Sequence, residues 1–176
     1  MLRRYFGWGV LAAATLVLAS CSALEDEARY PCPKVFILGD AGNMVRFKPG
    51  PGRDITDIVF EARIANFSGS CEYEKGGVDI ELVVRIDVQR GPASPDRRIA
   101  FDYFVAIPAF RPQPDAKRVL PVQGAFEENQ TRLVYQDEVK MFIPLDKPVE
   151  GVNTEVVIGF QLSEDEIEFN RALRQR

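Results

Sequence analysis

The sequence of 176 residues contains no histidine. This absence excludes an imidazole-dependent catalytic triad, a zinc site with histidine ligands and any acid–base catalysis by an imidazole ring. Lys and Arg number 22 against 26 Asp and Glu, which gives the chain a formal charge of −4. A mildly acidic chain with dispersed charges does not fit a surface that follows nucleic-acid phosphates. We therefore expect no nucleic-acid partner.

A hydrophobic run long enough to cross a membrane is also missing. The clearest apolar run, residues 8–18 (WGVLAAATLVL), follows Arg3 and Arg4. A transmembrane helix needs about 20 apolar residues, whereas a basic region followed by a run of this length is typical of a secretion signal. The sequence therefore predicts that residues 1–20 are a signal peptide, absent from the mature chain.

The end of this segment carries a second pattern, Leu18-Ala19-Ser20-Cys21. It resembles the lipobox of bacterial lipoproteins, in which a long apolar residue and two small residues precede the cysteine that becomes the new N-terminus. The resemblance implies a diacylglycerol on the Cys21 thiol, an acyl chain on its amine and attachment to a bilayer. Ser22 stands where inner-membrane members of the family tend to have Asp, which favours the periplasmic face of the outer membrane. The alternative is an ordinary cleavage site near an unmodified Cys21.

Cysteine is scarce, with three in the chain. If Cys21 carries lipid, Cys32 and Cys71 remain as a pair, and two thiols in the oxidising periplasm usually form a disulfide. Residues 34–38 and 54–67 both have the composition of strands, and antiparallel pairing between them would bring Cys32 beside Cys71. The prediction is a structural bridge between neighbouring strands, since catalytic redox pairs are commonly Cys-x-x-Cys.

Beyond Pro31 the dominant hydrophobic period is two, which is typical of half-buried β-strands. It is clearest in residues 78–88 (VDIELVVRIDV). Further strands are expected at residues 34–38, 54–67, 99–107, 117–124, 132–143 and 156–162. Residues 99–107 are apolar on nearly both faces, which favours a central strand.

One expected strand, residues 132–143, has an unclear register. We assign its first apolar side chains, Leu133 and Tyr135, to the face opposite Val139 unless a bulge intervenes near Gln136. A bulge inserts one residue and returns the side chains to the original face. The register of this strand therefore stays open.

Short turns rich in Gly, Pro and Asp separate these runs, and no long helical crossover joins them. The prediction is an all-β fold, an antiparallel β-sandwich of about seven strands at residues 32–162 behind a lipidated tether at residues 21–31. The spacing resembles immunoglobulin-like and fibronectin-type domains, although their core Trp is missing because the single Trp is Trp8. Residues 163–176 are either a short helix with a Ser163 and Glu166 capping box or a charged tail.

Carboxylates are the remaining acid–base groups, and a pair of them can hydrolyse a glycosidic bond. The candidate pairs are Asp54 with Asp57, Glu127 with Glu128, and Asp137 with Glu138. All lie at turns or on alternating strand faces, where solvation explains them, so we assign no catalytic residue. Residues 39–43 (GDAGN) offer oxygen ligands but lack the second acid and the bidentate Glu of a calcium loop, so we expect a turn and no metal.

Four aromatic residues are concentrated in one expected strand and the turn after it, Phe101, Tyr103, Phe104 and Phe110. They are either a surface for a partner or the sign of a strand that is buried on both faces. We favour burial in the core and keep the partner surface as the alternative.

The whole chain resembles proteobacterial lipoproteins that consist of a signal, a short tether and one β-sandwich. We expect a membrane-anchored, non-enzymatic envelope protein that binds or assembles with another envelope protein, with no cofactor besides the lipid on Cys21. Partner-strand addition at an exposed sheet edge is one physical route. The alternatives are a carrier of a lipid or other small apolar ligand and, third, a carboxylate-dependent glycan enzyme.

Overall fold

The structure, a computed structural model, describes residues 30–175. The expected signal peptide, the lipobox with Cys21 and most of the tether lie outside these residues. Within the described range, no helix combines the length and apolar character needed to cross a membrane.

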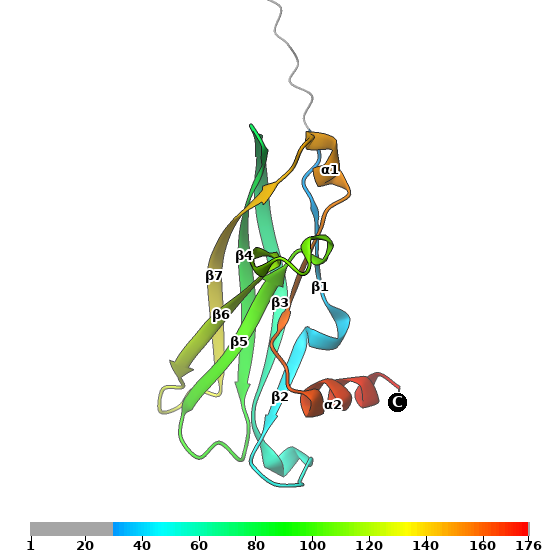
Figure 1. Cartoon of the computed structure of the whole chain (residues 1–176). Coiled ribbons are helices and arrows are strands. Elements are labelled where there is room, and N and C mark those ends of the chain that lie inside the picture. Colours follow the sequence, from blue (N-terminus) through cyan, green and yellow to red (C-terminus); the bar gives the residue numbers. More distant parts are fainter. Residues whose placement is uncertain (1–29, 176) are drawn as a thin grey trace, which may run out of the picture.

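Two four-stranded sheets make up most of the described chain (Figure 1). Their strands are β1 (Lys34–Ile37), β2 (Asn43–Phe47), β3 (Ile58–Glu74), β4 (Gly77–Arg90), β5 (Arg98–Ala106), β6 (Lys117–Ala125), β7 (Arg132–Pro144) and β8 (Glu155–Phe160). One sheet has the order β1-β8-β5-β6 and the other β2-β3-β4-β7. The expected β-rich architecture is confirmed, with more strands than the seven predicted.

Helices in the described residues are short. The α-helices are α1 (Pro148–Val152) and α2 (Glu164–Arg174), and the 3-10 turns are η1 (Gly39–Ala41), η2 (Ile55–Asp57), η3 (Pro108–Phe110) and η4 (Pro114–Ala116). Of the two predictions for the C-terminal residues, the short helix is confirmed and the charged tail is wrong.

Side chains from both sheets form one core. The alternating apolar residues of β3, β4 and β8 face inward as their period of two predicted, and they are buried. Phe101 of β5 connects the layers, because its ring centroid lies 6.0 Å from that of Phe60 in β3 and 6.5 Å from that of Tyr135 in β7. The period in the sequence therefore arises from two sheets packed face to face.

The prediction that β1 pairs with residues 54–67 is wrong. Strand β1 runs parallel to β8, from Lys34↔Glu155 to Ile37↔Ile158. After β1 the chain turns through η1 and enters the other sheet as β2, which pairs with β3. The five residues of β2 were missed because a segment this short shows no clear period.

The register of residues 132–143, which the sequence leaves open, is continuous in the structure. Strand β7 pairs with β4 without a register shift, from Arg132↔Gln89 to Pro144↔Gly77. Its odd-numbered side chains all face the core side, and Asp137 is the polar member of that series. Because Asp137 occupies an inward position, the alternation of apolar side chains in the sequence is interrupted there although the strand is continuous.

Candidate functional site

The predicted disulfide is confirmed, but its place in the fold differs from the expectation. Cys32 and Cys71 are bonded, with their Cα atoms 5.7 Å apart. Cys71 lies in β3, whereas Cys32 directly precedes β1 of the other sheet, so the bridge connects the two sheets and not neighbouring strands. The Tyr73 hydroxyl also donates to the Pro31 carbonyl at 2.9 Å. These contacts fix the point at which the N-terminal segment enters the folded body.

A small apolar pocket lies beside the disulfide. Its volume is about 180 Å³, and its walls include Val35, Phe67 and Leu82. Pockets for small organic ligands usually measure about 300 to 1,000 Å³. The pocket is therefore smaller than a carrier of lipid would need.

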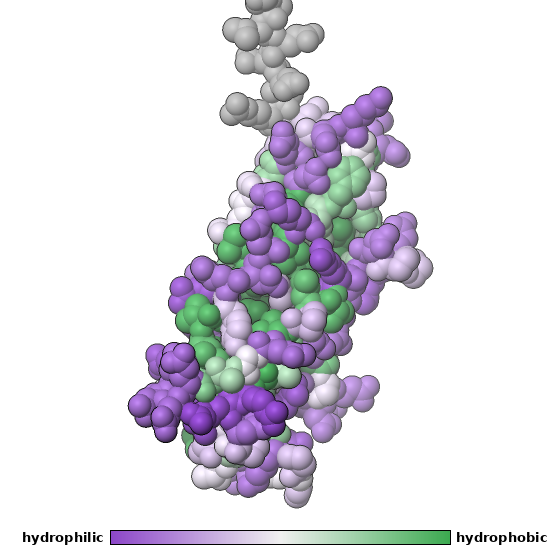
Figure 2. All heavy atoms as spheres, turned by 90° about the vertical axis from the view of Figure 1, so that its left-hand side faces the viewer, coloured by the Kyte–Doolittle hydropathy of each residue, from purple (hydrophilic) through white to green (hydrophobic). Residues whose placement is uncertain are grey.

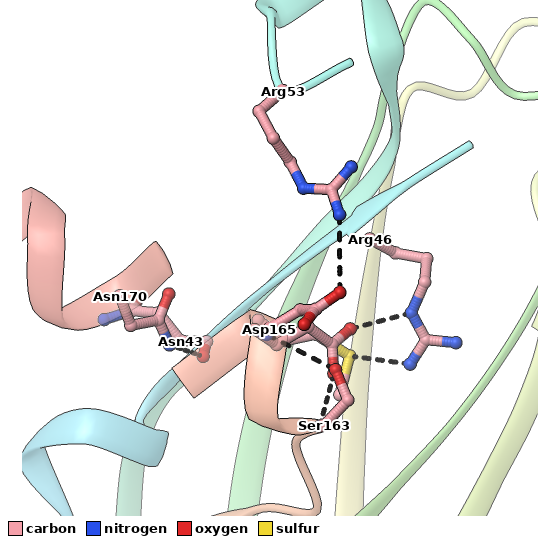
Figure 3. A network of polar contacts seen from close by, with 8 residues as sticks. Asn43, Arg46, Arg53, Ser163, Asp165 and Asn170 are labelled. Carbon is pink, nitrogen blue, oxygen red and sulfur yellow. Dashed lines mark hydrogen bonds and ion pairs between the residues drawn. The ribbon is translucent and has the colours of Figure 1, made fainter. Parts of the chain in front are cut away.

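A larger groove lies between β2, the turn after it and the N-terminus of α2. Its volume is about 560 Å³. Figure 3 shows Arg46 and Arg53 pointing from the strand and the turn toward the first turn of the helix, where Asp165 lies. The Arg46 guanidinium is 2.9 Å from the Glu166 carboxylate, and that of Arg53 is 3.5 Å from Asp165. Both cations are therefore used to hold α2 in place.

Besides these ion pairs, helix α2 is stabilised by its own capping box and by two further contacts with the body. Ser163 and Glu166 form the predicted capping box, in which the Glu166 N–H donates to Ser163 Oγ at 3.3 Å and the Ser163 N–H donates to Glu166 Oε2 at 2.9 Å. The buried Asn170 amide donates to the carbonyls of Asp40 and Asn43 at 2.9 and 2.8 Å. The rings of Phe169 and Phe47 meet edge to face, with centroids 5.0 Å apart. The helix thereby covers the free side of β2.

The loop considered as a calcium-loop fragment is a turn, as expected. Residues Gly39–Ala41 form η1. The Asp40 carboxylate pairs with the guanidinium groups of Arg171 and Arg174, at 3.3 Å from Arg171 Nε. Within residues 30–175, His, Cys, Asp and Glu side chains form no group of three or more able to hold a metal ion.

Of the first candidate pair, Asp57 makes structural contacts. Lys48 Nζ lies 2.7 Å from Asp57 Oδ1, and the Asp54 N–H donates to Asp57 Oδ2 at 3.1 Å. The hydrogen bond from Lys48, followed by that from Asp54, holds the pKa of Asp57 below its usual value. These contacts stabilise the turn around η2. Glu127 and Glu128 are exposed in the turn between β6 and β7.

Asp137 contacts the other sheet. Its Oδ2 accepts a 2.7 Å hydrogen bond from the hydroxyl of Tyr103, whose side chain is 0% exposed. Burial, and then the bond to Asp137, raise the pKa of the Tyr103 phenol far above its usual value. A buried phenol with so high a pKa stays protonated and acts as a hydrogen-bond donor.

The four aromatic residues considered as a partner surface do not form one. Phe101 and Tyr103 lie in the core between the sheets, and Phe110 is half-buried against it. Phe104 is buried on the outer face of its sheet, where Lys117 Nζ lies 4.2 Å from the ring centroid. This placement agrees with the favoured prediction, that β5 is buried on both faces.

The side formed by β6 and β7 was not singled out in the sequence. Large apolar side chains are exposed there, with Val134 at 54% and Phe142 at 47% on the outer face of one sheet and Val119 at 46% on the outer face of the other. Figure 2, which looks at the left-hand side of Figure 1, shows hydrophobic side chains along this side between hydrophilic ones. No protein-family model, curated protein or solved structure matches the chain. The β6 and β7 side brings together exposed apolar side chains and two edge strands, and it is the candidate site.

Proposed function

We propose that this protein is a lipid-anchored, non-enzymatic module of a bacterial envelope that binds another envelope protein. In this proposal Cys21 carries a diacylglycerol and an acyl chain, and the folded body lies in the periplasm at the outer membrane. Two or three acyl chains, at about 0.8 kcal/mol per buried CH₂, hold a protein on a bilayer far more firmly than one chain.

The long edge strand β7 carries the binding part of the proposal. It has 13 residues, is paired on one side only and exposes Val134 and Phe142. Long edges of this kind attract other strands, and soluble proteins usually cover or interrupt them. A partner that binds this side would form hydrogen bonds with the unpaired backbone groups of β7 and bury its exposed apolar side chains.

The entry point of the chain supports the anchoring part. The tether of residues 21–31 spans at most ~35 Å when extended. It joins the body at Tyr30 and Pro31, beside the disulfide that connects the two sheets. The body would therefore stay close to the membrane, with a fixed end toward it.

We also infer that the fold is an immunoglobulin-like sandwich. Two four-stranded sheets with one shared core and mainly antiparallel ladders support this inference. A bridge between the sheets, here Cys32–Cys71, is likewise a feature of many such domains.

Fractionation of cells that produce the full chain tests the anchor. We expect the wild-type protein to sediment with outer membranes and its Cys21→Ser variant to be released, because the thiol that would carry the lipid is gone. The matched control is Ser22→Ala, which leaves the cysteine in place and should still sediment. Mass spectrometry of the native product should show an acylated N-terminal cysteine. An unmodified thiol, or a different first residue, would contradict the proposal.

Purification from detergent-solubilised membranes separates the binding module from the carrier. We expect one defined envelope protein to copurify in proportion to the bait. Stoichiometric lipid beyond the covalent anchor, without a protein partner, would instead favour the carrier.

A further inference from the structure

We propose that the free edge of β7 receives an extended segment of the partner protein, which adds to the sheet as an antiparallel strand with alternating apolar and acidic side chains. This inference rests on the proposed function and deepens it. It names the surface, the backbone groups and the chemistry of the partner.

The sheet edges on the two sides of the molecule differ in strand length and in what covers them. On one side the edge strands β1 and β2 have 4 and 5 residues, and α2 packs against β2. On the other side β6 has 9 residues and contains Pro121, whereas β7 has 13 residues and no proline before Pro144. Of these edges, β7 is the one long enough and uninterrupted enough to pair with another strand.

Backbone hydrogen bonds at the two ends of β7 show which of its backbone groups are not bonded to β4. The Arg90 N–H donates to the Thr131 carbonyl and the Leu145 N–H donates to the Gly76 carbonyl, both in the register of the β4–β7 ladder. Antiparallel pairs alternate, so the odd-numbered residues of β7 bond to β4 and the even-numbered ones direct their backbone groups outward. Among the residues of the described chain, only Arg118 donates to that outward row, at 3.2 Å from the Lys140 carbonyl.

Side chains next to this edge are incompletely covered. Leu133, Tyr135 and Met141 face the core but remain half-buried, whereas the inward residues of the central strand β4 are fully buried. A strand added beside β7 would place every second side chain over this opening between the sheets. Apolar side chains at those positions would complete the burial, at roughly 25 cal/mol per Å² removed from water.

The charged residues of β6 and β7 indicate which side chains would alternate with the apolar ones in the incoming strand. Strands β6 and β7 carry the cations Lys117, Arg118, Arg132 and Lys140 against the anions Asp137 and Glu138, in a chain with a formal charge of −4. Lys140 is already paired with Glu138 and with Glu81 of β4. Lys117, Arg118 and Arg132 make no ion pair within residues 30–175, so acidic side chains on the incoming strand would find unpaired cations there.

A second copy of the chain fits this edge poorly. Strand β7 runs along the long axis of the molecule, and its C-terminal end points toward the end at which the chain enters (Figure 1). Antiparallel pairing of two β7 strands would put the two tethers at opposite ends, and β3 with its 17 residues shows that these ends are separated by ~55 Å. In a dimer whose long axis stands upright on the bilayer, a tether that reaches ~35 Å could not return the second copy to the same membrane. Parallel pairing in register would place Glu138 against Glu138 and Lys140 against Lys140.

Site-specific photo-crosslinking in cells that produce the lipidated chain tests the inference. The probe is p-benzoylphenylalanine placed at Val134 or at Phe142. We expect both positions to crosslink to one partner protein, at sites about eight residues apart and in reverse order, as antiparallel pairing requires. The control position is Val83, which is 38% exposed in the paired central strand β4 of the same sheet. It should give little product.

A blocking variant tests the backbone. Val134→Pro removes an outward N–H and keeps the bonds to β4, so crosslinking from Phe142 should fall about tenfold, the effect of losing one hydrogen bond in a sterically blocked site. Val134→Lys should act in the same direction, and Val83→Lys should not. Circular dichroism and an intact Cys32–Cys71 bond would show that each variant is folded.

The outcomes separate this inference from the proposed function. Crosslinks between two copies, equal products from Val134 and Val83, or sites that lack the antiparallel order would each overturn the edge-strand inference. A partner captured from a probe at Leu173 of α2, but not from β7, would overturn it while supporting the proposed function. A protein that gives no partner from any of these positions would contradict both.

Discussion

At the scale of single residues, the hydrogen bond between Tyr103 and Asp137 links the two sheets. It joins β5 of one sheet to β7 of the other, and the Tyr103 side chain is fully buried. It also explains why a carboxylate occupies an inward position of β7. The pair joins a buried phenol that stays protonated to the side-chain carboxyl group of Asp137.

Tyr103→Phe should therefore lower the free energy of unfolding by about 1.5 to 3 kcal/mol, because the Asp137 carboxylate loses its donor. Urea unfolding followed by circular dichroism measures this value. The matched control is Tyr135→Phe, since Tyr135 makes no side-chain hydrogen bond within the described residues and should lose less than 1 kcal/mol, roughly. Equal losses in the two variants would contradict a special role for the bond to Asp137.

The lowered pKa of Asp57 predicts how the free energy of unfolding changes at acidic pH. Its pKa in the folded protein lies below the usual value of 3.8, so near and below that pH the unfolded chain binds more protons than the folded one. The stabilisation is present above the unfolded pKa and is lost as the pH falls through the folded pKa. Asp57→Asn should flatten the acid side of a plot of unfolding free energy against pH, measured between about pH 2 and 6. An unchanged slope would show that other carboxylates determine the acid response.

At the scale of the element, α2 shows how a few contacts position a helix. Asn170 is 8% exposed and satisfies two backbone carbonyls, whereas Leu173 is 49% exposed. Asn170→Ala should destabilise the protein by about 1 to 3 kcal/mol, since it leaves those carbonyls without donors. Leu173→Ala should change stability by less than about 0.5 kcal/mol. Thermal unfolding of both variants checks this difference, and comparable losses would argue against Asn170 as the main fixing point.

Elements with local signals could be predicted, and those defined by distant partners could not. The inward series of β4 and the capping box of α2 follow from residues close in the sequence. Strand β2 is too short to show a period, and the parallel partner of β1 lies in β8, more than a hundred residues away. The disulfide was predicted from the cysteine count and the oxidising compartment. Its connection of the two sheets required the topology, which the strand pattern does not contain.

The candidate side could not be predicted for a related reason. The exposed Val134 and Phe142 occupy outward positions of an alternating strand. The sequence alone does not show whether another strand lies beside this one in the sheet. Only the strand order places β7 at an edge. The aromatic residues that drew attention in the sequence are instead core residues of β5, a strand between β8 and β6.

At the scale of the whole molecule, the two long sides differ in whether their edge strands are covered. One side is closed by the helix α2 and its ion pairs, and the other leaves β6 and β7 uncovered. The N-terminal entry point and α1 lie together at one end of the sheets (Figure 1). If that end faces a bilayer, the uncovered side stands upright on the membrane and is accessible to neighbours in the same leaflet.

The position of the Cys32–Cys71 bond has a mechanical consequence. A pulling force on the N-terminal segment would otherwise peel off β1, a strand of 4 residues with one ladder to β8. The bond transmits the load at Cys32 directly into β3, a strand of 17 residues that is paired with β4 from Phe60 to Glu74. The 39-residue separation of the cysteines also withholds roughly 130 Å of chain from extension while the bond is intact. The folded body can thus bear tension at its attachment point without lengthening there.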